Sequence, residues 1–430
     1  MKIAWFKKVI SPEIGAYIAG YSLKDKSVAK LDDLYMTGLC ADDGERKVLI
    51  VSFDLLGLDE GYMRELRRDC AKILGIEECA VLFSCTHTHT GPESRTLASA
   101  PQQLNRKYLE DLRNWTVDEV TRLGNWHDCN VYFYSSKCDE NRSRRYVTAC
   151  NRATFTPHRR EVAFIPTEYA DKELGQLCFI DKESGQPLYL VGNYAAHPLA
   201  GHAPGLGGLR ISADFPGAFR RYVTAETGAE SMFISGAAGD LVPKEDELGA
   251  DAIEQMGKNL GKAAIGGLID STRNPARFRM DDAKVGAYSK FVTVPLRKNK
   301  LNSMRPCYAG KTALDLEMQV VAIGDVCFVG VPGELCCELG QEIKWHSPFR
   351  RTWIAYNSTA YLDYIGHANM MVAGGYEGSA QLFTAKCGLM LLNTAADAMF
   401  ELREKLYPAE GDDIYPDCVK PPLVDIPANR

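Results

Sequence analysis

Short apolar runs alternate with helix-periodic segments along the chain, and this pattern predicts an α/β fold. Residues 47–55 (KVLIVSFDL) are mostly branched and apolar and have the length of a buried strand. Residues 60–74 place apolar side chains three or four positions apart, which is the spacing of one helix face, and Gly75 is suited to end that helix. Residues 80–84 form the next apolar run. A strand, a helix and a strand in this order predict two parallel strands with a right-handed crossover.

The same alternation recurs further along the chain. It predicts strands at residues 188–196, 231–235 and 352–356 and a helix at residues 213–226. It also predicts a hairpin at residues 319–331 that turns at Gly324-Asp325. After the hairpin, Pro332-Gly333-Glu334 leads into another predicted helix. Side chains that bind metals stand at the ends of several of these strands, next to glycine or proline. We therefore expect a ligand site at the carboxyl edge of the sheet, where α/β proteins bind their ligands.

Two histidines one residue apart, His87 and His89, directly follow the apolar run at 80–84. In an extended segment, side chains two positions apart point the same way, so both imidazoles can converge on one point. Imidazoles presented in this way bind metals or act on a reacting carbonyl. A pair of surface histidines in a turn is the alternative interpretation of this motif taken alone.

Composition and charge argue against a nucleic-acid-binding, membrane-spanning or secreted protein. The hydrophobic content of 46% and charged content of 25% are typical of a soluble globular protein, and a net charge of -6 argues against nucleic acid as the partner. No apolar run reaches the roughly 18 residues of a membrane span, and the N-terminus lacks the apolar core of a secretory signal, so we expect a cytoplasmic location. The 14 cysteines contain no C-x-x-C spacing, so a thiolate zinc site is not expected and the thiols should be reduced.

A glycine-rich stretch at residues 201–211 (GHAPGLGGLRI) is too irregular for a helix or a strand and is a candidate functional loop. Its glycines match neither the Walker pattern nor G-x-G-x-x-G, so no nucleotide site is expected.

Several short motifs in a fixed order resemble the neutral/alkaline non-lysosomal ceramidase family, specifically its N-terminal catalytic domain. The most specific of them is SCTHTHTGP at residues 84–92. The others are VISP at 9–12, AGY at 19–21, NRS at 141–143, AHP at 196–198, ISAD at 211–214, SGAAGD at 235–240, GVPGE at 330–334 and GYEG at 375–378. The resemblance spans about residues 9 to 400.

The resemblance implies a zinc site. The family binds one zinc ion through two histidines, a glutamate and a tyrosine, and the matching positions here are His87, His197, Glu334 and Tyr364, the last being twelve positions before Tyr376. His89, Arg142 and Tyr376 match family residues that line the site and act on the substrate. Asp54, Asp214 and Asp240 are candidate acceptors for the imidazole N–H groups, with ordinary cap or turn roles as the alternative.

Pattern and resemblance together predict an α/β fold with a mixed, largely parallel sheet flanked by helices. They predict a single ceramidase-like hydrolase domain at residues 1–407, followed by a Pro- and Asp-rich tail at residues 408–430.

The sequence also departs from the family. Val242 occupies the position of a family serine that is important for amide cleavage, and Arg144 stands where the family usually has proline. The sequence given stops near residue 430, so we do not expect the C-terminal domain of many ceramidases. A valine side chain is neither a nucleophile nor a hydrogen-bond donor. We therefore expect the metal chemistry to be retained and ceramide not to be the substrate.

The expected activity is attack of zinc-activated water on a carbonyl, most readily the amide of a small polar N-acyl compound. His89 or Tyr376 would protonate the leaving group, and Arg142 or His89 would assist the metal in stabilising the oxyanion. Arg142 and Arg210 indicate an anionic or polyhydroxylated substrate. Two alternatives stay open: an esterase or lactonase acting on a sugar or cyclitol derivative, and a non-catalytic binding module.

Overall fold

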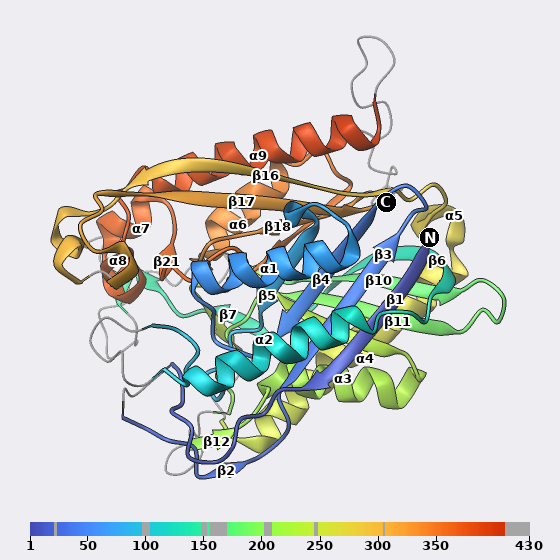
Figure 1. Cartoon of the computed structure of the whole chain (residues 1–430), viewed down its shortest axis with the longest axis horizontal. Coiled ribbons are helices and arrows are strands. Elements are labelled where there is room, and N and C mark those ends of the chain that lie inside the picture. Colours follow the sequence, from blue (N-terminus) through green and yellow to red (C-terminus); the bar gives the residue numbers. More distant parts are fainter. Residues whose placement is uncertain are drawn as a thin grey trace, which may run out of the picture.

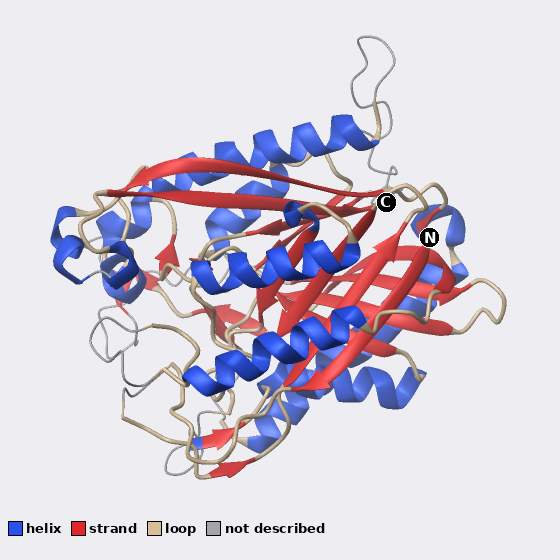
Figure 2. Cartoon of the chain, viewed as in Figure 1, coloured by secondary structure: helices blue, strands red, loops and turns tan. Residues whose placement is uncertain are grey.

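The computed structural model describes residues 1–20, 24–96, 104–147, 153–154, 170–201, 209–244, 248–303 and 306–408. Two β-sheets lie against each other, and helices cover the outer face of each sheet (Figure 1). The strands therefore form the interior of the molecule and the helices form its outside, as Figure 2 shows.

The larger sheet contains nine strands within the described residues. Eight follow one another in the order β13-β11-β10-β6-β1-β3-β4-β5, and β15 pairs with β6 off this path. Their bounds are β1 Lys2–Val9, β3 Tyr35–Asp42, β4 Lys47–Phe53, β5 Val81–Cys85, β6 His127–Lys137, β10 Glu173–Asp181, β11 Pro187–Tyr194, β13 Glu230–Ser235 and β15 Arg279–Met280.

The smaller sheet has the order β16-β17-β18-β20 among the described strands. Its strands are β16 Val285–Pro295, β17 Ala313–Ile323, β18 Val326–Gly330 and β20 Arg351–Ala355. The predicted hairpin turn at Gly324-Asp325 joins β17 to β18 and is confirmed.

The mixed α/β class is confirmed, but the expectation of largely parallel strands is wrong. Among the described pairs of the two sheets, only β4–β5, β11–β13 and β18–β20 are parallel. The reason lies in the connections: residues 43–46 join β3 to β4, and residues 182–186 join β10 to β11. Links this short permit only antiparallel pairing, because a parallel crossover needs a dozen residues or more.

Helices pack on the two outer faces through apolar stripes. Helices α1 (Glu60–Leu74) and α2 (Arg106–Thr121) cover one half of the larger sheet, and α3 (Asp214–Thr227) and α4 (Ala250–Arg273) cover the other half. Helices α6 (Cys337–Trp345) and α9 (Cys387–Leu406) cover the smaller sheet. The predicted helix at 60–74 is confirmed to the residue, and it ends at Gly75 in the left-handed conformation.

The core between the sheets joins residues from both. Ile50 and Phe179 of the larger sheet pack there with Phe328 and Trp353 of the smaller one, and each of these side chains is fully buried. Burying an apolar side chain of this size stabilises the fold by about 1.5–3 kcal/mol. The two sheets are thus held as one unit, and their strand ends keep a fixed relation.

Short elements complete the described chain. They are β2 Ala29–Lys30, β7 Asn141–Ser143, β8 Tyr146–Val147, β9 Ala153–Thr154, β12 Arg210–Ile211, β14 Leu241–Pro243, β19 Glu334–Leu335, β21 Tyr364–Ile365, α5 Pro275–Phe278, α7 Ala368–Ala373, α8 Gly375–Ala380, and the 3₁₀ turns Glu78–Ala80, Lys298–Ser303 and Pro306–Tyr308. Most of the predicted loop at 201–211 and of the tail at 408–430 lies outside the described residues.

Two further findings concern the whole described chain. The twelve cysteines in the described ranges are all free thiols. Within the same ranges, no helix combines the length and apolar character needed to cross a bilayer.

Candidate metal centre

The candidate site lies where strands of both sheets end. His87 follows β5, His197 follows β11, and Glu334 follows β18 after a short loop. Each of these strands has one parallel partner, so these three side chains lie at the carboxyl ends of parallel strands even though most pairs are antiparallel.

Hydroxyl side chains hold these strand ends together. Ser235 Oγ at the end of β13 donates to Thr86 O at 2.8 Å, and Ser84 Oγ of β5 donates to Tyr356 O at 2.9 Å. Tyr356 N in turn donates to Ser235 O at 3.0 Å. The segments after β5, β13 and β20 are thus linked to one another directly, and the residues that follow them cannot shift independently.

Three imidazoles and one carboxylate converge in the resulting space. Nε2 of His87 and Nε2 of His197 each lie 3.3 Å from Oε2 of Glu334. His89 Nε2 lies 3.2 Å from His87 Nε2, and one nitrogen from each of the three histidines falls within 4.8 Å of the others. His87, His197 and Glu334 are at most 2% exposed.

Backbone carbonyls determine which nitrogens of two of these rings carry hydrogen. Nδ1 of His87 lies 2.8 Å from Leu56 O, and Nδ1 of His197 lies 2.6 Å from Ala238 O. A carbonyl oxygen only accepts, so the carbonyl beside each Nδ1 favours the tautomer with a hydrogen there and a lone pair on Nε2, the form in which the ring can bind a metal ion. His197 Nε2 has no hydrogen-bond donor or acceptor with acceptable geometry within the described residues.

The three aspartates expected to accept from the imidazoles do not do so, and that hypothesis is wrong. Asp54 forms an ion pair with Arg220, Asp214 accepts from Gly201 N at 2.7 Å, and Asp240 accepts from Cys337 N at 2.7 Å. Backbone carbonyls take the role instead, Leu56 O for His87 and Ala238 O for His197.

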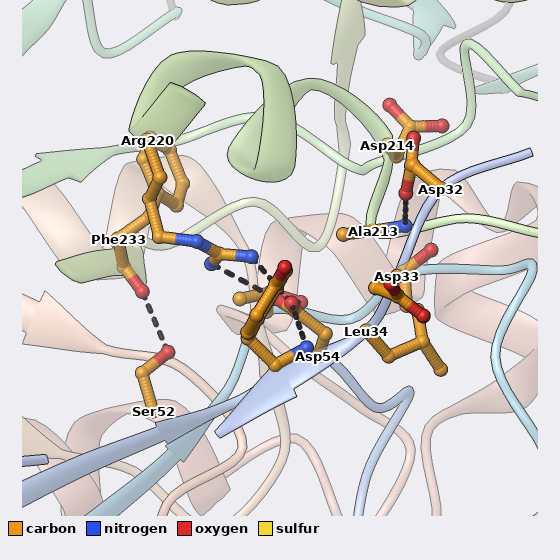
Figure 3. A network of polar contacts seen from close by, with 12 residues as sticks. Asp32, Asp33, Leu34, Ser52, Asp54, Ala213, Asp214, Arg220 and Phe233 are labelled. Carbon is orange, nitrogen blue, oxygen red and sulfur yellow. Dashed lines mark hydrogen bonds and ion pairs between the residues drawn. The ribbon is translucent and has the colours of Figure 1, made fainter. Parts of the chain in front are cut away.

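Asp54, drawn with Arg220 in Figure 3, supports the segment before His87. Arg220 reaches from α3 and donates through Nη1 to Asp54 Oδ1 at 3.0 Å and through Nη2 to Oδ2. The same carboxylate accepts from Tyr35 N at 2.7 Å and from Thr86 Oγ1 at 3.3 Å. A fully buried ion pair thus connects α3, β3 and the residue preceding His87.

The electrostatics favour neutral imidazoles beside a charged carboxylate. Burial, followed by the positive charge of Arg144, lowers the pKa of His197 to about 4, and burial together with the neighbouring histidines lowers the pKa of His89 well below its usual value. Burial alone would raise the pKa of Glu334, but its contacts with His87 and His197 hold that pKa well below the usual range.

Glu334 is further fixed by two phenols. Tyr356 Oη donates to Glu334 Oε2 at 3.2 Å, and Tyr361 Oη donates to Oε1. Both tyrosines come from the tyrosine-rich loop after β20, and that enrichment was the available sequence signal for them.

Tyr364 stands beside Glu334. The two residues are direct partners in the parallel ladder between β19 and β21, so adjacent backbones place them together. The Tyr364 hydroxyl accepts from Arg144 Nη2 at 2.9 Å, and its ring centre lies 5.3 Å from that of Tyr376. Burial raises the pKa of Tyr364 well above its usual value. Tyr376 is 53% exposed and therefore marks the solvent side of the group.

Arg142 lies on β7, next to the strand that carries the valine substitution. Val242 of β14 is its direct cross-strand partner, and Arg142 Nε donates to Lys244 O at 3.2 Å. The neighbouring Leu241 O lies 3.0 Å from His197 Nδ1, so the segment without the serine still supports the ring of His197.

Four non-glycine residues among those described have a left-handed backbone: His87 (φ 71°), Asp214 (φ 58°), Asn357 (φ 46°) and Asp363 (φ 54°). Asn357 Nδ2 lies 3.0 Å from His87 Nδ1, and Asp363 O accepts from Glu334 N at 2.8 Å. Three of the four strained positions therefore belong to the site or contact it. Each costs about 1–2 kcal/mol relative to ordinary backbone.

The donor set fits a divalent metal ion. With the hydrogen on each Nδ1, two imidazole lone pairs lie against a carboxylate oxygen, an arrangement that a bound cation would stabilise. Two neutral histidines and a carboxylate are ligands typical of catalytic zinc. His87, His89 and His197 form the histidine group with ligand spacing among the described residues.

Comparison with solved structures identifies the fold. The chain is similar to the crystal structure of neutral ceramidase from Pseudomonas aeruginosa, with a TM-score of 0.77 and 17% sequence identity over 97% of this chain and 76% of that one. It is equally similar to a ceramidase complexed with C2, with a TM-score of 0.77 and 17% identity over 97% of this chain and 77% of the other. At this identity the likeness establishes the fold, which is that of neutral ceramidase and confirms the expectation from the motifs. A scan against protein-family models and a search of curated proteins gave no match.

Proposed function

We propose that this protein is a zinc-dependent hydrolase of the ceramidase type, which cleaves the amide of a small polar N-acyl compound. Its metal ligands would be His87, His197, Glu334 and Tyr364. The observation that carries the proposal is the pair of imidazole Nε2 atoms, each 3.3 Å from the same oxygen of Glu334. The shared fold supports the proposal, because a protein of this fold is a neutral ceramidase.

A bound zinc ion would supply Lewis acidity and a water molecule of lowered pKa. The chain's own residues would do the rest. Tyr356 and Tyr361 hold both oxygens of Glu334, and backbone carbonyls orient His87 and His197. The site therefore needs little reorganisation on binding.

Proton transfer falls to the residues beside the ligands. His89 Nε2 is 3.2 Å from His87 Nε2, close enough to the ligands to accept a proton from the attacking water and return it to the leaving group. Tyr376 is half exposed and touches Tyr364, which suits contact with an arriving substrate. Arg142 would bind an anionic or polyhydroxylated part of that substrate.

Val242 makes ceramide an unsuitable substrate in this proposal, because its side chain cannot supply the hydrogen bond of the family serine. Cleavage of an ester or lactone of a sugar or cyclitol derivative remains the second candidate for the same metal chemistry, since such bonds demand less assistance to the leaving group. A non-catalytic binding module is the third interpretation. The cytoplasmic location stays a prediction.

Zinc content tests the proposal first. Protein purified without chelator is measured by elemental analysis, alongside His197→Ala and the control His346→Ala, which changes an exposed histidine at the end of α6. We expect about one zinc ion per chain in the wild type and in the control, and loss of zinc in His197→Ala. Wild-type protein that stays zinc-free after incubation with zinc would contradict the proposal.

Activity separates the remaining interpretations. Zinc-loaded protein is assayed with matched N-acyl and O-acyl derivatives of the same polar alcohols and amines. Faster turnover of the amide supports the proposed reaction, and turnover of esters alone supports the second candidate. Stoichiometric zinc without turnover of either series supports the binding module.

A further inference from the structure

Two adjacent buried arginines share one carboxylate close to the candidate metal centre. Arg144 Nε donates to Glu377 Oε1 at 2.7 Å, and Arg145 Nη1 donates to Glu377 Oε2 at 2.7 Å. Arg144 and Arg145 are 5% and 8% exposed, and Glu377 is 2% exposed. Removing ions from water is costly, so a cluster of this kind persists only where its geometry is well satisfied.

The two arginines differ in what else they bind. Arg144 Nη2 donates to the Tyr364 hydroxyl at 2.9 Å and to Gly239 O at 2.9 Å. Arg145 Nη2 instead donates to backbone carbonyls of the segment before Tyr376, Met370 O at 3.3 Å and Gly374 O at 3.0 Å. The cluster therefore offers a natural comparison: both cations stabilise Glu377, and Arg144 in addition binds a proposed metal ligand.

The guanidinium of Arg144 is held on several sides. Glu377 and Gly239 O fix two of its edges, and its central carbon lies 5.5 Å and 5.6 Å from the ring centres of Tyr364 and Tyr376. A guanidinium is planar and rigid, so once Nε–H and one N–H of Nη2 are fixed, the second N–H of Nη2 points to one place. That place is the Tyr364 hydroxyl oxygen.

The ladder between β19 and β21 fixes the backbone of Tyr364 beside Glu334, but a backbone ladder does not by itself select the side-chain rotamer. A donor at 2.9 Å restricts the rotamer at the oxygen itself. Residues that hold metal ligands in place from behind commonly change metal affinity when they are replaced.

We propose that Arg144 is a positioning residue of the metal centre, which fixes the Tyr364 hydroxyl oxygen in the direction of the metal. This inference rests on the proposed function, because it takes Tyr364 as a ligand. A role in folding alone is the competing explanation, and Arg145 provides the comparison that separates the two.

Zinc affinity, measured by competition with a chromophoric chelator, tests the inference in wild type, Arg144→Lys, Tyr364→Phe and the double variant. Arg144→Lys keeps the charge beside Glu377 and loses the planar fork. We expect zinc to bind about 10- to 100-fold more weakly in Arg144→Lys. In the Tyr364→Phe background the same substitution should have no further effect, because coupled residues are not additive. The matched control Arg145→Lys should bind zinc as the wild type does.

The absorption spectrum of cobalt(II)-substituted protein gives a second readout, since it reports the ligands directly. It should change in Arg144→Lys and Tyr364→Phe and stay unchanged in Arg145→Lys. Circular dichroism and thermal unfolding of each variant confirm that it is folded before zinc is measured.

Each possible outcome decides the inference. Equal zinc affinity in wild type and Arg144→Lys overturns it, as does an equal loss in Arg144→Lys and Arg145→Lys, which would indicate a role in folding. Unchanged affinity in Tyr364→Phe overturns it and leaves the zinc hydrolase standing. A wild-type protein without zinc affinity overturns both.

Discussion

Replacing Asp54 by asparagine should destabilise the fold and weaken the metal centre together. Asp54 is fully buried, Arg220 is 3% exposed, and both carboxylate oxygens bind the guanidinium. Removing one partner of a buried ion pair leaves an uncompensated charge and costs about 3–5 kcal/mol. At about 1.4 kcal/mol per factor of ten, this lowers the ratio of folded to unfolded protein by at least about 100-fold.

The assay is urea denaturation followed by circular dichroism, combined with zinc affinity of the folded variant. Asp54→Asn should lower the free energy of unfolding by about 3–5 kcal/mol. It should also weaken zinc binding, because Asp54 accepts from Thr86, the residue before His87. The double variant Asp54→Asn with Arg220→Met removes the unpaired charge and should recover part of the stability.

A buried pair elsewhere in the fold provides the control. Arg67 of α1 binds Glu317 of β17 through Nη2–Oε2 at 2.7 Å, and both are less than 10% exposed. Glu317→Gln should cost stability on the same scale without changing zinc affinity. Asp54→Asn within about 1 kcal/mol of the wild type would refute the reasoning, and so would a loss of zinc affinity that Glu317→Gln reproduces.

Two other measurements test the effect of a buried aspartate on the pH dependence of stability and whether the fold is stable without zinc. Burial raises the pKa of Asp214 to about 7, so folding disfavours its ionised form, and the contribution of Asp214 to the free energy of unfolding should fall by about 3 to 4 kcal/mol as the pH rises from about 4 to about 7. Asp214→Asn should remove that part of the fall in urea denaturation at several pH values, and an unchanged slope would contradict the assignment. Removal of zinc by a chelator should leave the circular dichroism spectrum unchanged, because the core between the two packed sheets stabilises the fold without the metal. Added zinc should restore the zinc content. Cooperative unfolding on chelation would show instead that the fold depends on the metal.

Much of the fold could be predicted because local patterns determined the elements. The apolar spacing at residues 60–74 gave α1 with its bounds, and the runs at 47–55 and 80–84 gave the parallel strands β4 and β5. An apolar run does not encode which neighbour a strand pairs with, however. The nine-stranded order, within the described residues, depends on packing between β6, β10 and β1, which lie far apart in the sequence.

The candidate site, like the fold, could be predicted only in part. His87, His197 and Glu334 were predictable because each follows a strand and lies in a motif, and the structure brings them together. The acceptors for the imidazoles were not predictable, because carbonyl positions depend on how a turn folds. The pair Arg144–Glu377 joins residues 233 positions apart, and its only sequence signal was an arginine in place of the usual proline.

The left-handed backbone at His87, Asn357 and Asp363 has a consequence for tracing the ancestry of this chain. Histidine, asparagine, aspartate and glycine adopt this conformation far more readily than branched or bulky residues do. Proteins that inherited the same arrangement should therefore show one of these four residue types at the positions equivalent to 357 and 363, however far the rest has diverged. Overall sequence identity is low, at 17% to the ceramidases. The residue types at these two positions therefore help to select distantly related sequences that share the arrangement.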